Sequence, residues 1–261
     1  MQAPDVIADI ADDLEIARNA VAKASMLALD HWKRGPLHWD KSDGSPVSEG
    51  DLAVDRALHE ALAKERPDYG WISEESPDDL ARLAKRHVWI ADPIDGTRDF
   101  IVGGIDWCIA LALLEEGKPI LAIVACPARE ETFTAMRGEG AYRDTQRLKM
   151  ADNLNLSEAT VIANRSVLAQ LGKASGGAPR LALSVRLCRI AEGSADATVA
   201  TTTKHDWDLA PGDLIVREGG GRVSTAAGVP FQFNRRETRQ AGLIAAPPRL
   251  HQDIVDKLRT A

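Results

Sequence analysis

The chain has 261 residues, 44% hydrophobic and 27% charged, with a formal net charge of −7. This composition is typical of a globular protein, and the length suffices for one large domain or two smaller ones. The negative charge argues against a surface that coats a nucleic-acid polymer, and no apolar run approaches the length of a membrane span.

The cysteines and the first residues bear on the compartment. Cys108, Cys126 and Cys188 are widely spaced, lie in apolar runs, and match no disulfide or zinc spacing, so we expect buried free thiols. The first residues lack the basic and apolar segments of a signal peptide. Both features predict a cytoplasmic protein.

The first half of the chain predicts two helices and then a series of strands. Apolar residues recur at helical spacing over residues 5–33, and Gly35-Pro36 ends that helix. Ser48 is placed to cap a second helix, with Asp51 three residues on. The apolar face of this second helix is predicted to contain Leu52, Leu58 and Leu62. The predicted strands cover residues 71–73, 88–91, 107–114, 120–126 and 131–135.

From about residue 151 the pattern changes to shorter alternating segments. Strands are predicted near 161–163, 195–199 and 242–246, and helices over 186–192, 208–218 and 249–260. The pattern predicts two packed α/β or α+β halves, with a boundary between residues 145 and 155. We therefore divide the chain into residues 1–150 and 151–261.

The most informative segment is Asp-Pro-Ile-Asp-Gly-Thr at residues 92–97, which follows an apolar strand. Two carboxylates, a hydroxyl and free backbone amides come together where that strand ends. Pro93 stiffens the turn, and Gly96 lets a ligand approach the backbone. Two neighbouring carboxylates repel each other unless a cation lies between them, and hard oxygen ligands suit Mg²⁺ or Mn²⁺. The segment predicts a metal site that handles phosphate.

Other acidic segments have both a functional and a purely structural interpretation. Glu74-Glu75 follows a predicted strand, where acid pairs are common on surfaces, although it could complete an oxygen-rich cage. Asp208 could be a metal ligand or a helix N-cap. The 41–51 segment could be a polar loop with a cap, or it could bring Asp51 near metals and Lys41 near a substrate anion. His205 is interpreted as a pocket-edge or surface residue, because hard cations prefer oxygen.

Taken together, these segments resemble the inositol monophosphatase superfamily of metal-dependent phosphatases. Residues 92–97 match its Asp-Pro-Ile/Leu-Asp-Gly-Thr motif, and 207–212 match its Trp-Asp-x-Ala-x-Gly motif. The pair at 74–75, the Ser-Pro-Val-Ser stretch at 45–51 and the segment 187–193 also resemble family segments. The resemblance covers about residues 5–260, in the family order.

The resemblance implies an α+β protein with the layered α/β/α/β/α sugar-phosphatase fold. It implies that residues 1–150 carry most metal ligands and that residues 151–261 close the substrate pocket. It further implies two or three Mg²⁺ ions per site, with Mn²⁺ as a substitute, sensitivity to Li⁺, and a homodimer. The implied ligands of two metals are Glu74, Asp92, the Ile94 carbonyl, Asp95 and Asp208.

The resemblance also assigns roles around those metals. Asp51 and Glu75 hold a further, weaker metal through water. Glu74, Thr97 and Asp51 are the implied catalytic residues, and the amides of Gly96 and Thr97 bind phosphate. The candidate substrate-pocket residues are Lys41, Ser184, Arg186 and His205.

The substrate remains open at this stage. An inositol or sugar monophosphate is the family's commonest substrate. A 3′(2′),5′-bisphosphate nucleotide, as in the CysQ-like branch, and histidinol phosphate are alternatives. Residues 180–186 lack the Gly-Ser/Thr pair that many members carry before the 187–193 segment. A catalytically inactive metal- or phosphate-binding regulatory protein is the non-enzymatic alternative.

Overall fold

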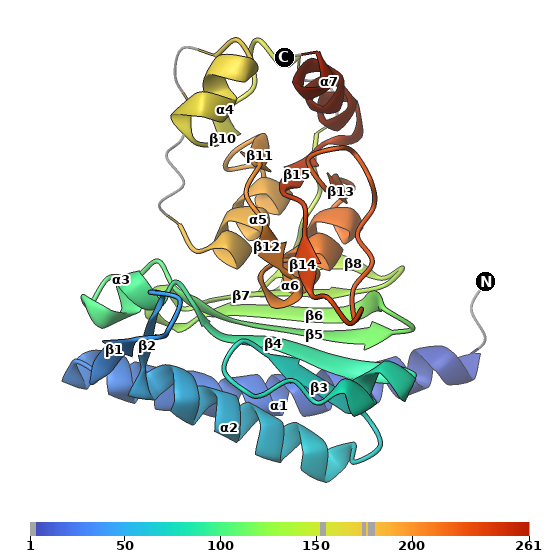
Figure 1. The fold of residues 1–261 in the computed structure, drawn as a ribbon. Coiled ribbons are helices and arrows are strands. Elements are labelled where there is room, and N and C mark those ends of the chain that lie inside the picture. Colours follow the sequence, from blue (N-terminus) through green and yellow to red (C-terminus); the bar gives the residue numbers. More distant parts are fainter. Residues whose placement is uncertain (1–3, 152–154, 174–175, 177–180, 261) are drawn as a thin grey trace.

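The computed structural model describes residues 4–151, 155–173, 176 and 181–260. Within these residues, helices and sheets alternate in layers (Figure 1). Two long helices cover one face of a seven-stranded sheet, and two shorter helices cover the other face. A four-stranded sheet with two outer helices lies beyond them. The prediction of an α+β protein with an α/β/α/β/α arrangement is confirmed.

The first layer consists of α1 (Pro4–Arg34), which is close to its predicted bounds, and α2 (Glu49–Glu65), which begins directly after the predicted cap Ser48. Leu52, predicted on the buried face of α2, is instead 37% exposed. Leu52 precedes Val54 by two residues, which is about 200° around a helix of 3.6 residues per turn, so the two cannot share a face. The buried residues of α2 are Gly50, Asp51, Val54, Asp55, Leu58 and Leu62.

The seven-stranded sheet follows the chain order from one edge to the other. Its first two strands are parallel, and every later neighbour pair is antiparallel. The strands are β3 (Gly70–Ser73), β4 (His87–Asp95), β5 (Cys108–Glu115), β6 (Lys118–Cys126), β7 (Glu131–Met136), β8 (Gly140–Arg143) and β9 (Gln146–Arg147).

The central strands of this sheet are buried on both faces, which explains their nearly continuous apolar sequences. Strand β5 shows the alternation. Ile109, Leu111 and Leu113 pack into the core beneath α1 and α2. Cys108, Ala110, Ala112 and Leu114 pack into the core on the opposite face. The sheet therefore separates two hydrophobic cores.

The opposite core is covered by α5 (Leu183–Glu192) and α6 (Asp206–Glu218). Beyond them lies the four-stranded sheet, in the order β10-β11-β15-β13. The outer helices α4 (Arg165–Gln170) and α7 (Pro248–Arg259) pack on it around a third core. The strands of this sheet are β10 (Val161–Ile162), β11 (Ala197–Ala200), β13 (Arg222–Ser224) and β15 (Leu243–Ala246).

Several short elements were missed by the sequence analysis because two to six residues are too few to show a period. The predicted polar turn is a small hairpin, β1 (His38–Asp40) with β2 (Pro46–Ser48). A second missed pair joins β12 (Lys204–His205) to β14 (Arg239–Gln240). The other missed elements are β9, α3 (Thr97–Ile101), α4 and the 3₁₀ turns at Leu80–Ala84 and Pro127–Arg129.

The predicted end of one strand and the predicted starts of two helices were wrong. Strand β4 does not stop at Ala91 but continues through the two aspartates to Asp95. Helix α5 begins three residues before Arg186, and α6 begins two residues before Asp208. The seven-stranded sheet ends at Arg147 and the four-stranded sheet begins at Val161. Residues 152–154 lie outside the described part, and the division into two domains stays a prediction. None of the described helices is both long and apolar enough to span a bilayer.

Candidate metal centre

Glu74 and Asp92 lie side by side because β3 and β4 are parallel. Ser73, the last residue of β3, pairs with Ala91, so the next residue of each strand is an acid at the same edge of the sheet. The amide of Glu74 donates to the Ala91 carbonyl at 3.3 Å. Two acids that are 18 positions apart in the sequence are thereby neighbours.

A β-bulge at Pro93 and Ile94 places both aspartates of the motif on one face. Asp92 pairs with Ala110 and Asp95 with Cys108, so three steps along β4 match two along β5. In a regular strand, residues three apart point to opposite faces, and the extra residue restores the same face. Proline, which has no amide hydrogen, is tolerated at such a bulge. The spacing of the two acids therefore depends on this irregularity.

Asp208 comes from the opposite layer, in the first turn of α6. Its Oδ2 accepts a hydrogen bond from the backbone amide of His205 at 2.8 Å, which fixes the side chain at the helix start. Carboxylate oxygens of Glu74, Asp92 and Asp208 all lie within 4.8 Å of one another. The structure thus brings together three of the four predicted carboxylate ligands. We call these three residues the acidic cluster.

Burial and mutual repulsion disfavour the ionised forms of Asp92 and Asp208, two members of the acidic cluster. Burial, then the charges of Glu74, Asp95 and Asp208, raise the pKa of Asp92 well above its ordinary value. Burial, followed by the charge of Asp95, raises the pKa of Asp208 to about 7. A bound divalent cation would remove this repulsion, and the all-oxygen donor set fits Mg²⁺ or Mn²⁺.

Asp95, the fourth predicted carboxylate ligand, contacts the start of α5 on the other side of the sheet edge. Its Oδ1 accepts from the Leu183 amide at 3.1 Å and its Oδ2 from the Ser184 amide at 2.6 Å. These are the first amides of α5, which would otherwise lack partners, so Asp95 caps that helix. The early start of α5 follows from this tertiary cap, which sequence periodicity cannot reveal.

Asp51 and Thr97 meet beside the metal motif. The Thr97 hydroxyl lies 3.0 Å from both Asp51 Oδ1 and the Ile94 carbonyl oxygen. Asp51 Oδ2 accepts from the Ser48 amide at 2.9 Å and from its hydroxyl at 2.5 Å, which completes the predicted capping box. Asp51 therefore lies beside the metal motif, and both of its carboxylate oxygens already have hydrogen-bond partners.

Asp55 holds the loop that carries the two glutamates. It lies one turn after Asp51 on α2 and is 7% exposed. Its carboxylate accepts from Ser73 Oγ at 2.5 Å and from Ser76 Oγ, on either side of Glu74-Glu75. The sequence analysis missed Asp55, although its spacing of four residues from Asp51 on a helix was an available signal.

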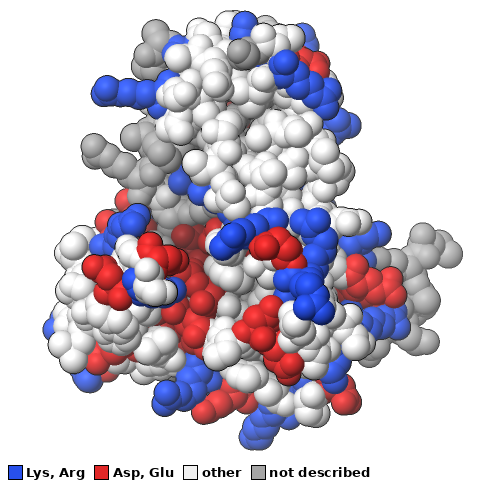
Figure 2. All heavy atoms as spheres, viewed as in Figure 1, with Lys and Arg blue, Asp and Glu red and all other residues white. Residues whose placement is uncertain are grey.

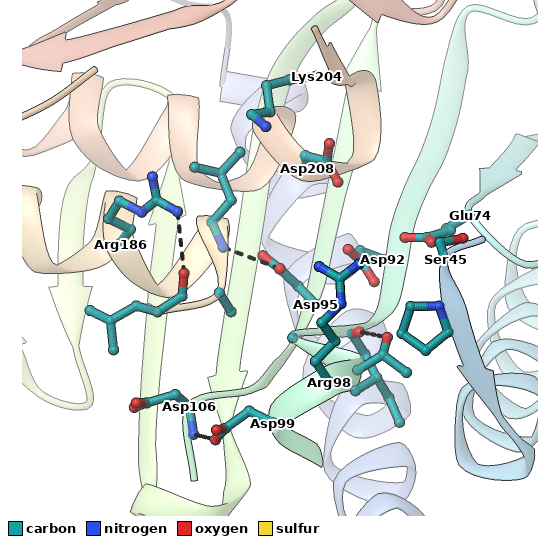
Figure 3. Close-up of a pocket in the computed structure, with 17 residues that line it drawn as sticks. Ser45, Glu74, Asp92, Asp95, Arg98, Asp99, Asp106, Arg186, Lys204 and Asp208 are labelled. Atoms are coloured by element: carbon teal, nitrogen blue, oxygen red, sulfur yellow. Dashed lines mark hydrogen bonds between the residues drawn. The ribbon is translucent and has the colours of Figure 1, made fainter. Parts of the chain in front are cut away.

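The acidic cluster forms one side of a cavity of about 380 Å³. Figure 2 shows acidic side chains gathered in a hollow of the surface, with basic side chains at its rim. Figure 3 shows Glu74 and Arg186 on opposite sides, with Asp92 and Asp95 between them. Predicted residues that line the cavity are Glu74, Asp92, Ile94, Asp95, Gly96, Thr97, Arg186 and Asp208.

The cavity also contains residues that the sequence analysis missed. Arg98 follows the metal motif directly, and Lys204 lies on the unpredicted strand β12. Arg186 is only 9% exposed, and within the described part of the chain its Nε has no hydrogen-bond partner. Arg186, Lys204 and Arg98 form what we call the basic wall. Adjacency to the motif could have identified Arg98, but nothing in the sequence signalled Lys204.

Three predicted substrate residues are not among the described residues that line the cavity. Lys41 instead contacts Glu74 and Glu75. The His205 ring stacks on Trp207 with centroids 4.6 Å apart. Ser184 is fully buried, with its amide bonded to Asp95. Of the four residues predicted to contact substrate, only Arg186 faces the cavity.

The comparisons with known proteins agree with this geometry. The chain matches the model of the inositol monophosphatase family over residues 9–261. A histidinol-phosphatase of Mycobacterium tuberculosis is 30% identical, covering 95% of this chain and 98% of the relative. A Nus factor SuhB of Pasteurella multocida is also 30% identical, covering 94% and 95%. A solved structure of a Thermotoga maritima IMPase has a TM-score of 0.83 at 25% identity, covering 95% and 97%. The chain therefore belongs to the inositol monophosphatase family, as the sequence motifs predicted.

Proposed function

We propose that this protein is a Mg²⁺-dependent phosphomonoesterase that hydrolyses a small phosphorylated metabolite, an inositol or sugar monophosphate, with water as the nucleophile. The acidic cluster carries the proposal, because three separate elements converge to hold its oxygens within 4.8 Å of one another beside a cavity. The proposed ligands of two ions are Glu74, Asp92, the Ile94 carbonyl, Asp95 and Asp208.

The protein's own residues have distinct tasks in this reaction. Mg²⁺ bound at the cluster would supply an activated water and neutralise charge that develops on the phosphoryl group. Thr97 donates its hydroxyl proton to Asp51, so its oxygen is free to accept a proton from the attacking water. Glu74 orients the same water. The amides of Gly96 and Thr97 hold phosphate oxygens.

The backbone conformation at position 96 requires a glycine. Its φ of +100° is left-handed, and a Cβ atom there would come within 2.6 Å of the Asp106 carbonyl oxygen. The absent side chain leaves the amide accessible from the cavity, which Gly96 helps to line. The glycine therefore supports both the turn and the proposed phosphate contact.

A phosphate-release screen tests the proposal. Purified protein is incubated with inositol monophosphate, 3′-phosphoadenosine 5′-phosphate and histidinol phosphate, with Mg²⁺ and with a chelator. We expect metal-dependent release, largest from inositol monophosphate. The absence of release from all three with either Mg²⁺ or Mn²⁺ would favour a non-catalytic regulatory role, which the similarity to a Nus factor makes worth testing.

A second candidate substrate is a phosphate ester whose leaving group carries another anion, such as a bisphosphate nucleotide. Arg186 favours it, because a nearly buried guanidinium lines the cavity with its Nε unpaired among the described residues. Burial lowers the pKa of Arg186, so a substrate anion would relieve an unfavourable charged state. The guanidinium fork suits phosphate or carboxylate groups.

We also propose a homodimer in the cytoplasm, as the resemblance implies. Light scattering would show twice the 28.2 kDa of the chain for the dimer. A mass of one chain at micromolar protein concentration would contradict it.

A further inference from the structure

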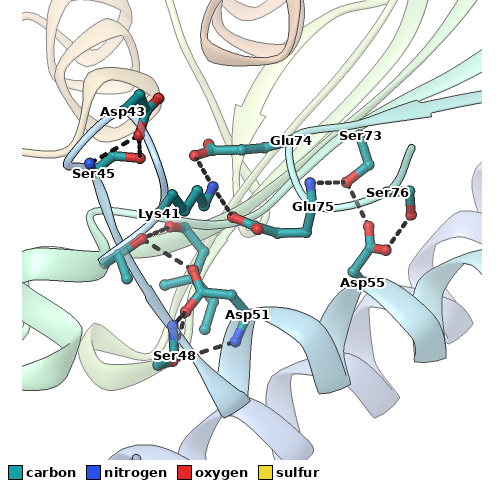
Figure 4. A network of polar contacts seen from close by, with 12 residues as sticks. Lys41, Asp43, Ser45, Ser48, Asp51, Asp55, Ser73, Glu74, Glu75 and Ser76 are labelled. Carbon is teal, nitrogen blue, oxygen red and sulfur yellow. Dashed lines mark hydrogen bonds and ion pairs between the residues drawn. The ribbon is translucent and has the colours of Figure 1, made fainter. Parts of the chain in front are cut away.

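The ammonium group of Lys41 lies between the carboxylates of Glu74 and Glu75 (Figure 4). Its Nζ is 2.9 Å from Glu74 Oε1 and 2.6 Å from Glu75 Oε1. The Glu75 side chain is 6% exposed and that of Lys41 is 23% exposed. A largely desolvated glutamate thus has a cation from the protein itself as its partner.

The backbone around Lys41 holds the ammonium in this position. Lys41 follows strand β1, and its amide donates to the Ser45 carbonyl at 2.7 Å. Its own carbonyl accepts from the Gly44 amide at 2.9 Å, so both backbone groups are bonded within the hairpin. A tethered and pre-ordered cation loses less entropy on binding than a free ion does.

The two residues that a third metal would need already have other partners. The resemblance assigned such an ion to Asp51 and Glu75 through water, but Glu75 already binds Lys41. Asp51 Oδ1 accepts from Thr97, and Asp51 Oδ2 accepts from Ser48. A small divalent ion that dehydrates reluctantly would have to displace a short, charge-assisted contact here.

We propose that Lys41 replaces a third metal ion as a resident cation, so that the site binds two divalent ions and no more. The inference rests on the proposed two-metal function. It makes Lys41 a positioning residue that neutralises Glu75 and holds Glu74 toward the acidic cluster. It also gives Lys41 a role other than the substrate contact that the sequence analysis suggested.

Counting bound Mn²⁺ tests the inference without an activity assay. The electron paramagnetic resonance signal of free Mn²⁺, followed as the ion is titrated into metal-free protein, gives the number bound per chain. We expect two for the wild type and three for Lys41→Met, because the substitution opens Glu75 to an ion. Adding Glu75→Gln to Lys41→Met should return the number to two. Lys41→Gln makes the same comparison should the methionine variant fail to fold.

Two variants control for charge. Lys41→Arg keeps the cation and should bind two ions. Lys204→Met removes a positive charge from the cavity that Glu74 lines, at a residue that forms no hydrogen bond or ion pair with either glutamate in the described part of the chain, and it should also bind two. A wild type that binds three ions, a Lys41→Met protein that binds two, or a third ion in Lys204→Met would each overturn the inference. A wild type that binds no Mn²⁺ would instead overturn the proposed function.

Discussion

The acidic cluster and the basic wall face each other across one cavity, but they are held in different ways. The acids Asp92 and Asp208 are fixed by a strand bulge and a helix start, and their oxygens converge with those of Glu74. The members of the basic wall are spread over three elements, and none of them forms an ion pair within the described residues. Under the proposed function, we expect metal ions to complete the first side and the charge of the substrate to complete the second.

The largest expected effect is on the acidic cluster. Asp92→Asn removes one of the carboxylates proposed to bind metal, and a neutral amide is a poor replacement. Loss of several kcal/mol of transition-state stabilisation corresponds to a fall in kcat of about 10³-fold or more. The variant should stay folded, and its metal-free Tm should not fall, because one buried repulsive charge is gone.

Steady-state kinetics at saturating Mg²⁺ and thermal melting with a chelator check both statements. Asp68→Asn is the matched control, since it makes the same change at an exposed position in the turn between α2 and β3. Full activity of Asp92→Asn at saturating Mg²⁺ would refute the assignment of the metal centre.

The same contrast explains what the sequence could predict. Glu74, Asp92 and Asp208 lie in contiguous motifs at element ends, so residue types and order were enough to find them. The bulge that aligns Asp92 with Asp95 leaves no signal except Pro93. The basic wall was mostly missed, because Lys204 lies on a two-residue strand whose partner β14 is 34 or more positions away. Only the folded chain shows that this segment reaches the cavity.

The elements of the fold likewise fall into those that the sequence predicted and those that it did not. The long helices and the central strands were predicted because periodicity and apolar runs persist over many residues. The start of α5 could not be predicted, because Asp95, from a distant strand, supplies its cap. Leu52 was predicted to be buried because it is apolar, but its angle around α2 turns it away from the face that contains Val54.

Replacing Mg²⁺ with Ca²⁺ is the next largest expected effect. The larger ion accepts longer and looser coordination, so the acidic cluster would hold it without fixing the attacking water. We expect turnover to fall by about 10²-fold or more, which is within the rate contribution that a correctly positioned proton transfer makes. Phosphate release with each ion alone, and with both in competition, measures the effect. Equal turnover with Ca²⁺ and Mg²⁺ would contradict the positioning argument.

We also expect inhibition by Li⁺, which the resemblance implies.

Metal-free protein should lose stability as pH rises. The pKa of Asp208 is raised to about 7 by burial and then by the charge of Asp95, so between about pH 4 and 7 the folded state binds more protons than the unfolded state. The free energy of unfolding therefore falls with increasing pH in that window. Tm should fall by several degrees, since 1 kcal/mol shifts Tm by about 2–4 °C in a chain of this size.

The variant Asp208→Asn separates the contribution of Asp208 to this pH dependence from the contributions of other titrating groups. In the presence of a chelator, its Tm should decline less with rising pH than that of the wild type. Saturating Mg²⁺ should also flatten this decline in the wild type by stabilising the ionised acids. A slope of Tm against pH that is the same in wild type and Asp208→Asn would show that Asp208 is not held in an unfavourable charged state.

The smallest expected effect lies on the basic wall and distinguishes the candidate substrates. If the fork of Arg186 holds a second anionic group, Arg186→Ala should raise KM for a bisphosphate and leave KM for a monophosphate with a neutral leaving group nearly unchanged. A lost hydrogen bond to a charged group is worth about 1.5–3 kcal/mol, or one to two decades in kcat/KM. Arg186→Lys should recover only part of the loss, because an ammonium cannot donate in the bidentate geometry of a guanidinium.

Arg189→Ala provides the matched control. Arg189 lies on the same helix as Arg186 but pairs with Glu131 and Glu192. It is not among the described residues that line the cavity. Kinetics on both substrate classes, with the three variants side by side, give the ratio of the two kcat/KM values directly. A small, equal change for both substrates in Arg186→Ala would mean that the guanidinium only packs against the Leu181 carbonyl, to which it donates at 3.3 Å. In that case the basic wall would not select a second anion, and an inositol or sugar monophosphate would remain the better candidate.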